Sequence, residues 1–256
     1  MRVHEWMTPD LVVVDPTTPA AECRQRMREC GIRTLPVVDD GALVGRVTDA
    51  AAFGQQTTDA TAGDLMSPVP VLASPDDPLT EVLARCAWAM QDAVYVVDRG
   101  QLVGILTEHD VCRHAASELP PHLVVRDAAS TTPVCVAAHT RARDALFEMR
   151  RRFVRHLVVT DGQRLVGVVS LRDLLVEPKL AALPIGDLVR GPVVWTVGWD
   201  TPLREAATSI TAHLVGCLPV VPDDRSVVEG VLCRSDLVRA LLRWGAVGDD
   251  RLRVNA

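Results

Sequence analysis

The sequence Gly104-Ile105-Leu106-Thr107-Glu108-His109-Asp110 decides the fold, because versions of it occur four times along the chain. The shared pattern is a Gly, two residues that are apolar except for Arg46 in the first copy, a Thr or Ser, two further residues and an Asp, and each occurrence is a signature segment. The other three are Gly45–Ala51, Gly167–Asp173 and Gly230–Asp236. They recur at intervals of roughly 60 residues, which indicates a protein built from four tandem repeats.

The four signature segments are unequal. The second and third are complete. In the first, Ala51 stands where the others have Asp, and in the fourth, Cys233 stands where the others have Thr or Ser. The apolar frame is therefore better kept than the polar residues, which indicates that the repeat is first of all an architecture.

Composition and charge exclude several classes of protein. The 256 residues are 48% hydrophobic, which is enough for a folded core, and the formal net charge of −6 argues against a general nucleic-acid or membrane-surface binder. No apolar run approaches the roughly 20 residues that span a bilayer, and the N-terminus has no secretory apolar stretch. We therefore expect a cytoplasmic protein that contacts neither membrane nor nucleic acid.

The cysteines and histidines show no motif of a metal or catalytic site. The seven cysteines are an odd number without a Cys-x-x-Cys pair, and the histidines show no His-Glu-x-x-His spacing. Reduced core thiols and no metal site are therefore predicted. The cysteines are Cys23, Cys30, Cys86, Cys112, Cys135, Cys217 and Cys233.

Each repeat has the same predicted order of elements, β-α-β-β-α. A short strand after a Pro turn is expected in all four copies, at 12–14, 70–72, 134–136 and 193–197. A helix should follow, capped by Thr18, Asp77, Thr140 or Thr201, with Pro as its first residue in three copies. Two apolar runs joined by a tight turn then predict a β-hairpin, and a second helix follows the signature segment, for example over Leu171–Lys179 and Arg234–Trp244.

The repeats should pack in pairs, because one unit of this size cannot bury both faces of its sheet. The predicted repeats are 1–58, 59–119, 120–180 and 181–256. The Pro-rich segment Leu119-Pro120-Pro121-His122 divides them into a pair over 1–119 and a pair over 120–256. The expected fold class is α+β.

This order of elements, the Pro-Val-Val entry to the hairpin and the signature segment that leaves it resemble the cystathionine β-synthase (CBS) domain. The resemblance covers almost the whole chain. It implies four CBS repeats in two pairs, each pair with a pseudo-two-fold axis and two clefts. It also implies adenosine-containing ligands in those clefts, such as AMP, ADP, ATP or S-adenosylmethionine, and no catalytic cofactor.

Carried over by position, the resemblance assigns a ribose-binding carboxylate to Asp110, Asp173 and Asp236. It assigns the accompanying hydroxyl to Thr107, Ser170 and Thr48. Vicinal ribose hydroxyls suit this pairing chemically, and the signature Gly would let the strand approach closely. The phosphate would meet an arginine contributed by the paired repeat, Arg33 in the first pair or Arg155 in the second, with His156 as a further donor. The second and third repeats are predicted to hold the best clefts and the first the poorest.

The function implied is regulatory. The expected protein binds an adenosine ligand, changes conformation and signals to a protein partner, and we expect it to form a homodimer. No nucleophile elbow, phosphate-binding loop or metal-ligand motif indicates an enzyme. Two alternatives remain open from the sequence: an assembly module with empty clefts, and an enzyme that acts on a bound nucleotide.

Overall fold

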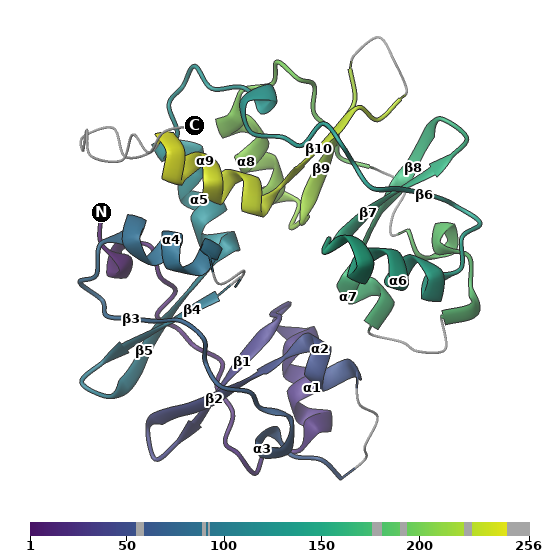
Figure 1. Cartoon of the computed structure of the whole chain (residues 1–256). Helices are drawn as coiled ribbons and strands as arrows, with labels where there is room; N and C mark the ends of the chain where they lie inside the picture. Colours follow the sequence, from purple (N-terminus) through teal and green to yellow (C-terminus); the bar gives the residue numbers. More distant parts are fainter. Residues whose placement is uncertain are drawn as a thin grey trace. The chain divides into compact units, whose positions relative to one another are not determined.

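The computed structural model describes residues 1–54, 59–88, 91, 93–175, 181–189, 194–222 and 227–244. The chain divides into two compact units, Met1–Asp110 and Val111–Ala256 (Figure 1). Four tandem repeats follow one another along the chain, as the sequence predicts. The expected turn at Gly191-Pro192 and residue 193 of the predicted fourth first-strand lie outside the described residues.

The first two repeats form a mixed sheet with strand order β1-β2-β5-β4-β3. Its strands and the associated helices are η1 (Val3–Glu5), α1 (Ala20–Glu29), β1 (Thr34–Asp39), β2 (Ala42–Thr48), α2 (Asp49–Gly54), α3 (Ala62–Leu65), β3 (Leu72–Ala73), α4 (Leu79–Trp88), β4 (Ala93–Asp98), β5 (Gln101–Thr107) and α5 (Glu108–Glu118).

The third and fourth repeats form a sheet of order β6-β7-β8 and a two-stranded sheet β10-β9. Their elements are η2 (Val125–Asp127), β6 (Cys135–Ala137), α6 (Ala142–Arg152), β7 (His156–Asp161), β8 (Arg164–Ser170), α7 (Leu171–Leu175), η4 (Ile185–Leu188), α8 (Leu203–Ala212), β9 (Cys217–Val220), β10 (Gly230–Cys233) and α9 (Arg234–Trp244). Helix α9 has the predicted bounds, whereas 176–179 of the other predicted helix lie outside the described residues.

The first strand of the repeat unit is present in only two copies. β3 and β6 pair in parallel with β4 and β7, as expected for the predicted unit. In the first and fourth repeats the prediction of a strand is wrong for the described residues. There a single residue, Val14 or Val197, bridges to the first strand of the hairpin. Each of these segments lies at a sheet edge. Only that one residue makes backbone hydrogen bonds to the hairpin strand through both its amide and its carbonyl.

The predicted helix caps are displaced by one residue. Pro19 and Pro202 precede the first helical residue instead of occupying it, and neither helix has a side-chain cap. The hydroxyl of Thr18 instead accepts from the amide of Asp15 at 3.1 Å and closes the preceding turn. The amide of Ala20 is satisfied by the carbonyl of Ala60, 2.8 Å away. A distant backbone group therefore replaces the local cap that the sequence predicted.

The first three hairpins have the predicted tight turns, whereas residues 223–226 in the turn of the fourth lie outside the described residues. In the first, Asp40 and Gly41 take positive φ values of 47° and 83°. Two successive positive φ angles match the two-residue turn that follows the right-handed twist of paired strands. The turns between β4 and β5 and between β7 and β8 also connect directly opposed strands. They fix the register that places each signature segment at the end of the second hairpin strand.

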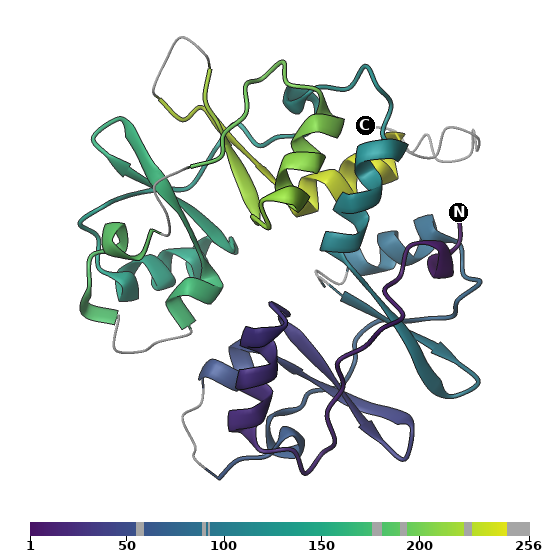
Figure 2. The same cartoon turned by 180° about the vertical axis from the view of Figure 1, so that it is seen from behind.

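The two repeats of each unit exchange their N-terminal segments. Thr8 exchanges both backbone hydrogen bonds with Ile105 of β5, and Ser67 does the same with Arg46 of β2. In the second unit, Ser130 pairs in this way with Val231 of β10. Figure 2 shows the N-terminal segment crossing the β4–β5 hairpin. The repeats therefore complete one another's sheets, which explains why they occur in pairs.

The predicted helical stripes form the core. In the third repeat, Ala145 and Met149 of α6 pack in one buried cluster with Leu157, Val159 and Val169 of the hairpin. Within the described part of the chain, no helix has both the length and the apolar character needed to cross a bilayer.

Candidate functional site

The polar residues of a complete signature segment cap the second helix of the repeat. At the β8–α7 junction, the amide and the hydroxyl of Ser170 both donate to Oδ2 of Asp173, at 2.9 and 2.6 Å. Thr107 and Asp110 make the same two bonds at the same distances before α5. The hydroxyl and the carboxylate are thus held together at the start of a helix, where a carboxylate is also favoured by the helix dipole.

The three signature carboxylates differ in access to solvent. Asp110 is 4% exposed, and its Oδ1 accepts from the hydroxyl of Thr8 at 2.8 Å. Asp173 is half-buried. Asp173 is therefore the more accessible of the two that belong to complete segments.

Asp236 in the fourth repeat is buried and internally bonded. It is 5% exposed, accepts from the amide of Cys233 at 2.6 Å and forms an ion pair with Arg239. Burial raises the pKa of Asp236, while the Cys233 amide and the Arg239 guanidinium oppose that shift. This carboxylate is less available to a ligand than Asp173.

The first repeat has no carboxylate at the signature position. The hydroxyl of Thr48 accepts from the amide of Ala51 at 3.2 Å and caps α2 alone. The neighbouring Asp49 is turned to its own helix end, where its Oδ1 accepts from the amide of Ala50 at 2.8 Å. Asp49 therefore does not replace the missing group.

The signature glycines accommodate the exchanged segments. A Cβ placed on Gly104 would lie 2.4 Å from Sδ of Met7, and one on Gly167 would lie 2.2 Å from Cγ1 of Val189. Real Cβ atoms do not approach so closely, so a side chain at either position would require the crossing segment to shift. The sequence interpretation assigned this space to a ligand, whereas the structure fills it with a side chain of the crossing segment.

The candidate phosphate residues occupy equivalent places before the hairpins. The carbonyl of Arg33 accepts from the first amide of α2, and that of Arg155 accepts from the first amide of α7, both at 2.8 Å. The two side chains are half-buried. Gly216 holds the equivalent place in the fourth repeat, where its carbonyl accepts from Arg234 at 3.2 Å. The position in the second repeat, Asp92, lies outside the described residues.

His156 begins β7 directly opposite Ser170, and its ring lies against Gly216. Two cysteines are its neighbours: Cys217 begins β9 directly opposite Cys233, which ends β10. The hydrogen bond with Cys233 and burial raise the pKa of Cys217. No sequence motif predicts this group, because spacings of 61 and 16 residues match no ligand motif. The signal available in the sequence is that His156, Cys217 and Cys233 each stand at the first or last position of a hairpin.

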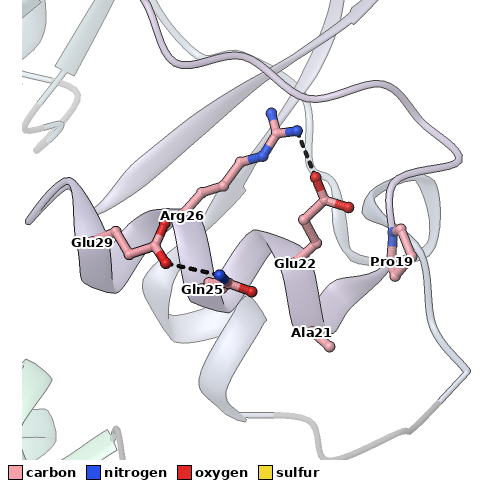
Figure 3. A pocket seen from close by; sticks show the side chains of 6 residues that line it. All are labelled: Pro19, Ala21, Glu22, Gln25, Arg26 and Glu29. Atoms are coloured by element: carbon pink, nitrogen blue, oxygen red, sulfur yellow. Dashed lines mark hydrogen bonds and ion pairs between the residues drawn. The ribbon is translucent and has the colours of Figure 1, made fainter.

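A separate hollow lies on the outer face of α1 (Figure 3). Its polar groups are paired along the helix: Arg26 with Glu22 at 2.5 Å, and Gln25 with Glu29 at 2.8 Å. The hollow contains no signature residue. We assign it no function.

Comparison with known proteins finds the CBS domain four times, over residues 3–52, 62–117, 125–179 and 185–243. Protein MJ1225 of Methanocaldococcus jannaschii is 22% identical over an alignment of 266 positions, which covers 90% of this chain and 94% of that protein. An inosine-5'-monophosphate dehydrogenase of Korarchaeum cryptofilum is 28% identical over 113 residues. That match covers 43% of this chain and only 23% of the enzyme.

Two solved structures share the fold over nearly the whole chain. The crystal structure of MJ1225, proposed to be an archaeal homologue of γ-AMPK, has a TM-score of 0.80 at 20% identity and covers 93% of this chain and 99% of its own. A conserved protein of Pyrococcus horikoshii has a TM-score of 0.70 at 22% identity, over 94% and 100% of the two chains. The four matched segments span most of the sequence in the order that the structure shows, and this chain belongs to the CBS domain family.

Proposed function

We propose that this protein is a regulatory sensor that binds an adenosine-containing ligand at Ser170 and Asp173. The observation that carries the proposal is the pairing of these side chains at 2.6 Å beside a half-buried carboxylate. The candidate ligands are AMP, ADP, ATP and S-adenosylmethionine. Membership of the CBS family and the relation of MJ1225 to γ-AMPK support a ligand-dependent regulatory role.

The chemistry of the site suits a nucleoside. The carboxylate of Asp173 offers acceptors to the two vicinal ribose hydroxyls, and Ser170 offers a hydroxyl that can donate or accept. Arg155 lies just before the hairpin that carries Ser170, in the same repeat rather than in the paired one, and its planar guanidinium suits a phosphate. The ring of His156 lies against Gly216, so the phosphate contact falls to Arg155 in this proposal.

The second repeat supplies a weaker cleft. Thr107 and Asp110 have the same arrangement as Ser170 and Asp173, but a ligand there would compete with the bond from Thr8 to Asp110. Arg33 would provide the phosphate contact in that unit. The fourth repeat, with Asp236, and the first, with Thr48 alone, rank below both.

Binding would be transmitted through the exchanged segments. Each unit has its two repeats joined by segments that pair with the other repeat's hairpin. A ligand that prefers one arrangement of a repeat pair shifts the population toward it, and a protein partner that distinguishes the arrangements then responds. We propose that the protein acts in this way as a homodimer.

The test is ligand-dependent stability of the full chain. A ligand at about 100 times its dissociation constant should add roughly 2.7 kcal/mol to the free energy of unfolding. Replacing Asp173 by Ala removes a charge-assisted hydrogen bond, and we expect affinity to fall about 10- to 100-fold. Asp161→Ala, at an exposed hairpin position of the same repeat, is the matched control. Unchanged binding by Asp173→Ala, or no stabilisation by any of the four ligands, would refute the proposal.

An assembly module with empty clefts is the second candidate. The burial of Asp110 and Asp236 favours it, since two of the three signature carboxylates are at most 5% exposed to solvent. Native mass spectrometry distinguishes the two functions. A defined protein partner with no bound adenosine compound supports assembly, whereas an adenosine compound that leaves in Asp173→Ala supports sensing.

A further inference from the structure

Equivalent positions at the ends of the four hairpins carry different chemistry in the two units. The first residue of each hairpin lies directly opposite the last, and these eight residues are the pairs Thr34 and Thr48, Ala93 and Thr107, His156 and Ser170, and Cys217 and Cys233. In the first unit all are hydroxyl or methyl side chains. The second unit has an imidazole and two thiols.

These three side chains come together although they lie far apart in sequence. One ligand atom each from His156, Cys217 and Cys233 lies within 4.8 Å of the other two. The β7–β8 and β9–β10 hairpins approach each other at one end in both views (Figures 1 and 2). Cys217 is 3% exposed, and the other two residues are half-buried.

Gly216 makes room for the imidazole. A Cβ placed on Gly216 would lie 2.0 Å from Nε2 of His156, so any larger residue there would displace the ring. The equivalent residues Arg33 and Arg155 carry long side chains. The fourth repeat therefore has a glycine where the first and third have an arginine, and this glycine leaves space for the imidazole of His156 beside the two thiols.

We propose that His156, Cys217 and Cys233 form a binding site for a thiophilic metal ion, with zinc as the expected occupant. Two thiolates and one imidazole are a ligand set that zinc prefers, and a tetrahedral complex places such ligand atoms about 3.4–3.8 Å apart. The observed separations reach this range through side-chain shifts of about 1 Å. Two thiolates also balance the charge of a divalent ion, so the complex does not bury a net charge. Three protein ligands leave one tetrahedral position for an exogenous group.

This site occupies the place where the fourth repeat would otherwise bind a nucleoside. Cys233 stands at the hydroxyl position of the signature segment, and the adjacent Asp236 is paired with Arg239. The fourth repeat thus exchanges ribose chemistry for metal chemistry. The inference does not depend on ligand binding at Asp173, which lies in the third repeat.

The experiment uses the full chain, treated with a chelator and kept under a phosphine reductant. Zinc is titrated in competition with a chromophoric chelator, and cobalt(II) serves as the spectroscopic probe. We expect one zinc per chain and an intense near-ultraviolet thiolate-to-cobalt absorption. Cys233→Thr installs the residue found at Thr48 and Thr107 and should weaken zinc binding by more than about 100-fold. His156→Asn should weaken it comparably while the thiolate absorption persists.

The controls separate this site from other thiols and from the nucleoside cleft. Cys135→Ser, at an exposed cysteine outside the cluster, should bind zinc as the unaltered chain does. Asp173→Ala should also bind zinc normally, so loss of adenosine binding and loss of zinc binding are distinguishable. Equal zinc affinity in Cys233→Thr, or a cobalt complex without thiolate absorption, would overturn the proposal.

Discussion

At the scale of single residues, the same helix-capping carboxylate occurs in three different surroundings. Asp110, Asp173 and Asp236 all begin a helix and all accept from the last strand residue of their hairpin. What differs is burial: Asp110 and Asp236 are at most 5% exposed, whereas Asp173 is half-buried. The local motif therefore sets where the carboxylate lies, while the packing around it decides whether a ligand can reach it.

The bond from Thr8 to Asp110 should be a large contribution to the stability of the first unit. Thr8→Val keeps the side-chain shape but removes a donor to a carboxylate that is 4% exposed. Hydrogen bonds to charged groups contribute about 1.5–3 kcal/mol, and we expect a loss of that size in chemical denaturation. Thr17→Val is the control, because Thr17 donates at 2.7 Å to Asp15 on the surface. Equal losses in the two variants would contradict this account.

At the scale of elements, the exchanged segments explain both the pairing of repeats and the signature glycines. Ser67 and Ser130 each pair with the second hairpin strand of the neighbouring repeat. The glycine of that strand removes the Cβ that would otherwise meet the crossing chain. One sequence repeat is therefore not one packed body, because its N-terminal segment packs on the hairpin of the other repeat in the pair.

The glycines should differ in their tolerance of a methyl group. Gly167→Ala brings a Cβ within 2.2 Å of the stiff Val189 side chain, so we expect a loss of about 1–3 kcal/mol in unfolding free energy. Gly104→Ala should cost less, because Met7 has flexible torsions that can move its sulfur away. Thermal and urea denaturation measure both. Gly54→Ala, which would meet nothing within 4 Å, is the control, and a greater loss for Gly104→Ala than for Gly167→Ala would refute the packing argument.

Local patterns were sufficient for much of the fold. The apolar stripe and flanking residues gave the bounds of α9, and the Asp-Gly turn gave the first hairpin. The displaced helix starts could not be found in this way, because the amide of Ala20 bonds Ala60, 40 residues away. The same holds for the candidate sites. Ser170 and Asp173 are three residues apart and visible as a pattern, whereas His156 and Cys217 meet only through packing.

At the scale of the whole molecule, the two units have the same plan and different polar chemistry. The first unit has hydroxyl and methyl groups at its hairpin ends, and its one complete signature carboxylate is buried. The second has the half-buried carboxylate of Asp173 and the group of His156, Cys217 and Cys233. Duplication has thus kept the core and concentrated the candidate ligand chemistry in the second unit.

Hydrogen exchange should locate ligand binding in that second unit. The probe is AMP, or whichever of the four adenosine ligands gives the largest thermal shift, at about 100 times its dissociation constant. Amides of α6, β7 and β8 that exchange through opening of the second unit should then exchange about 100-fold more slowly. Amides of α1 and β1 should change little, because they belong to the other compact unit and its own core. At the same ligand concentration, Asp173→Ala should reduce the protection to about 2- to 10-fold, because its affinity is lower, and Asp161→Ala should retain the full protection. Equal protection of both units would show that they open as one cooperative body, and protection of the first unit alone would place the ligand at Thr107 and Asp110 instead.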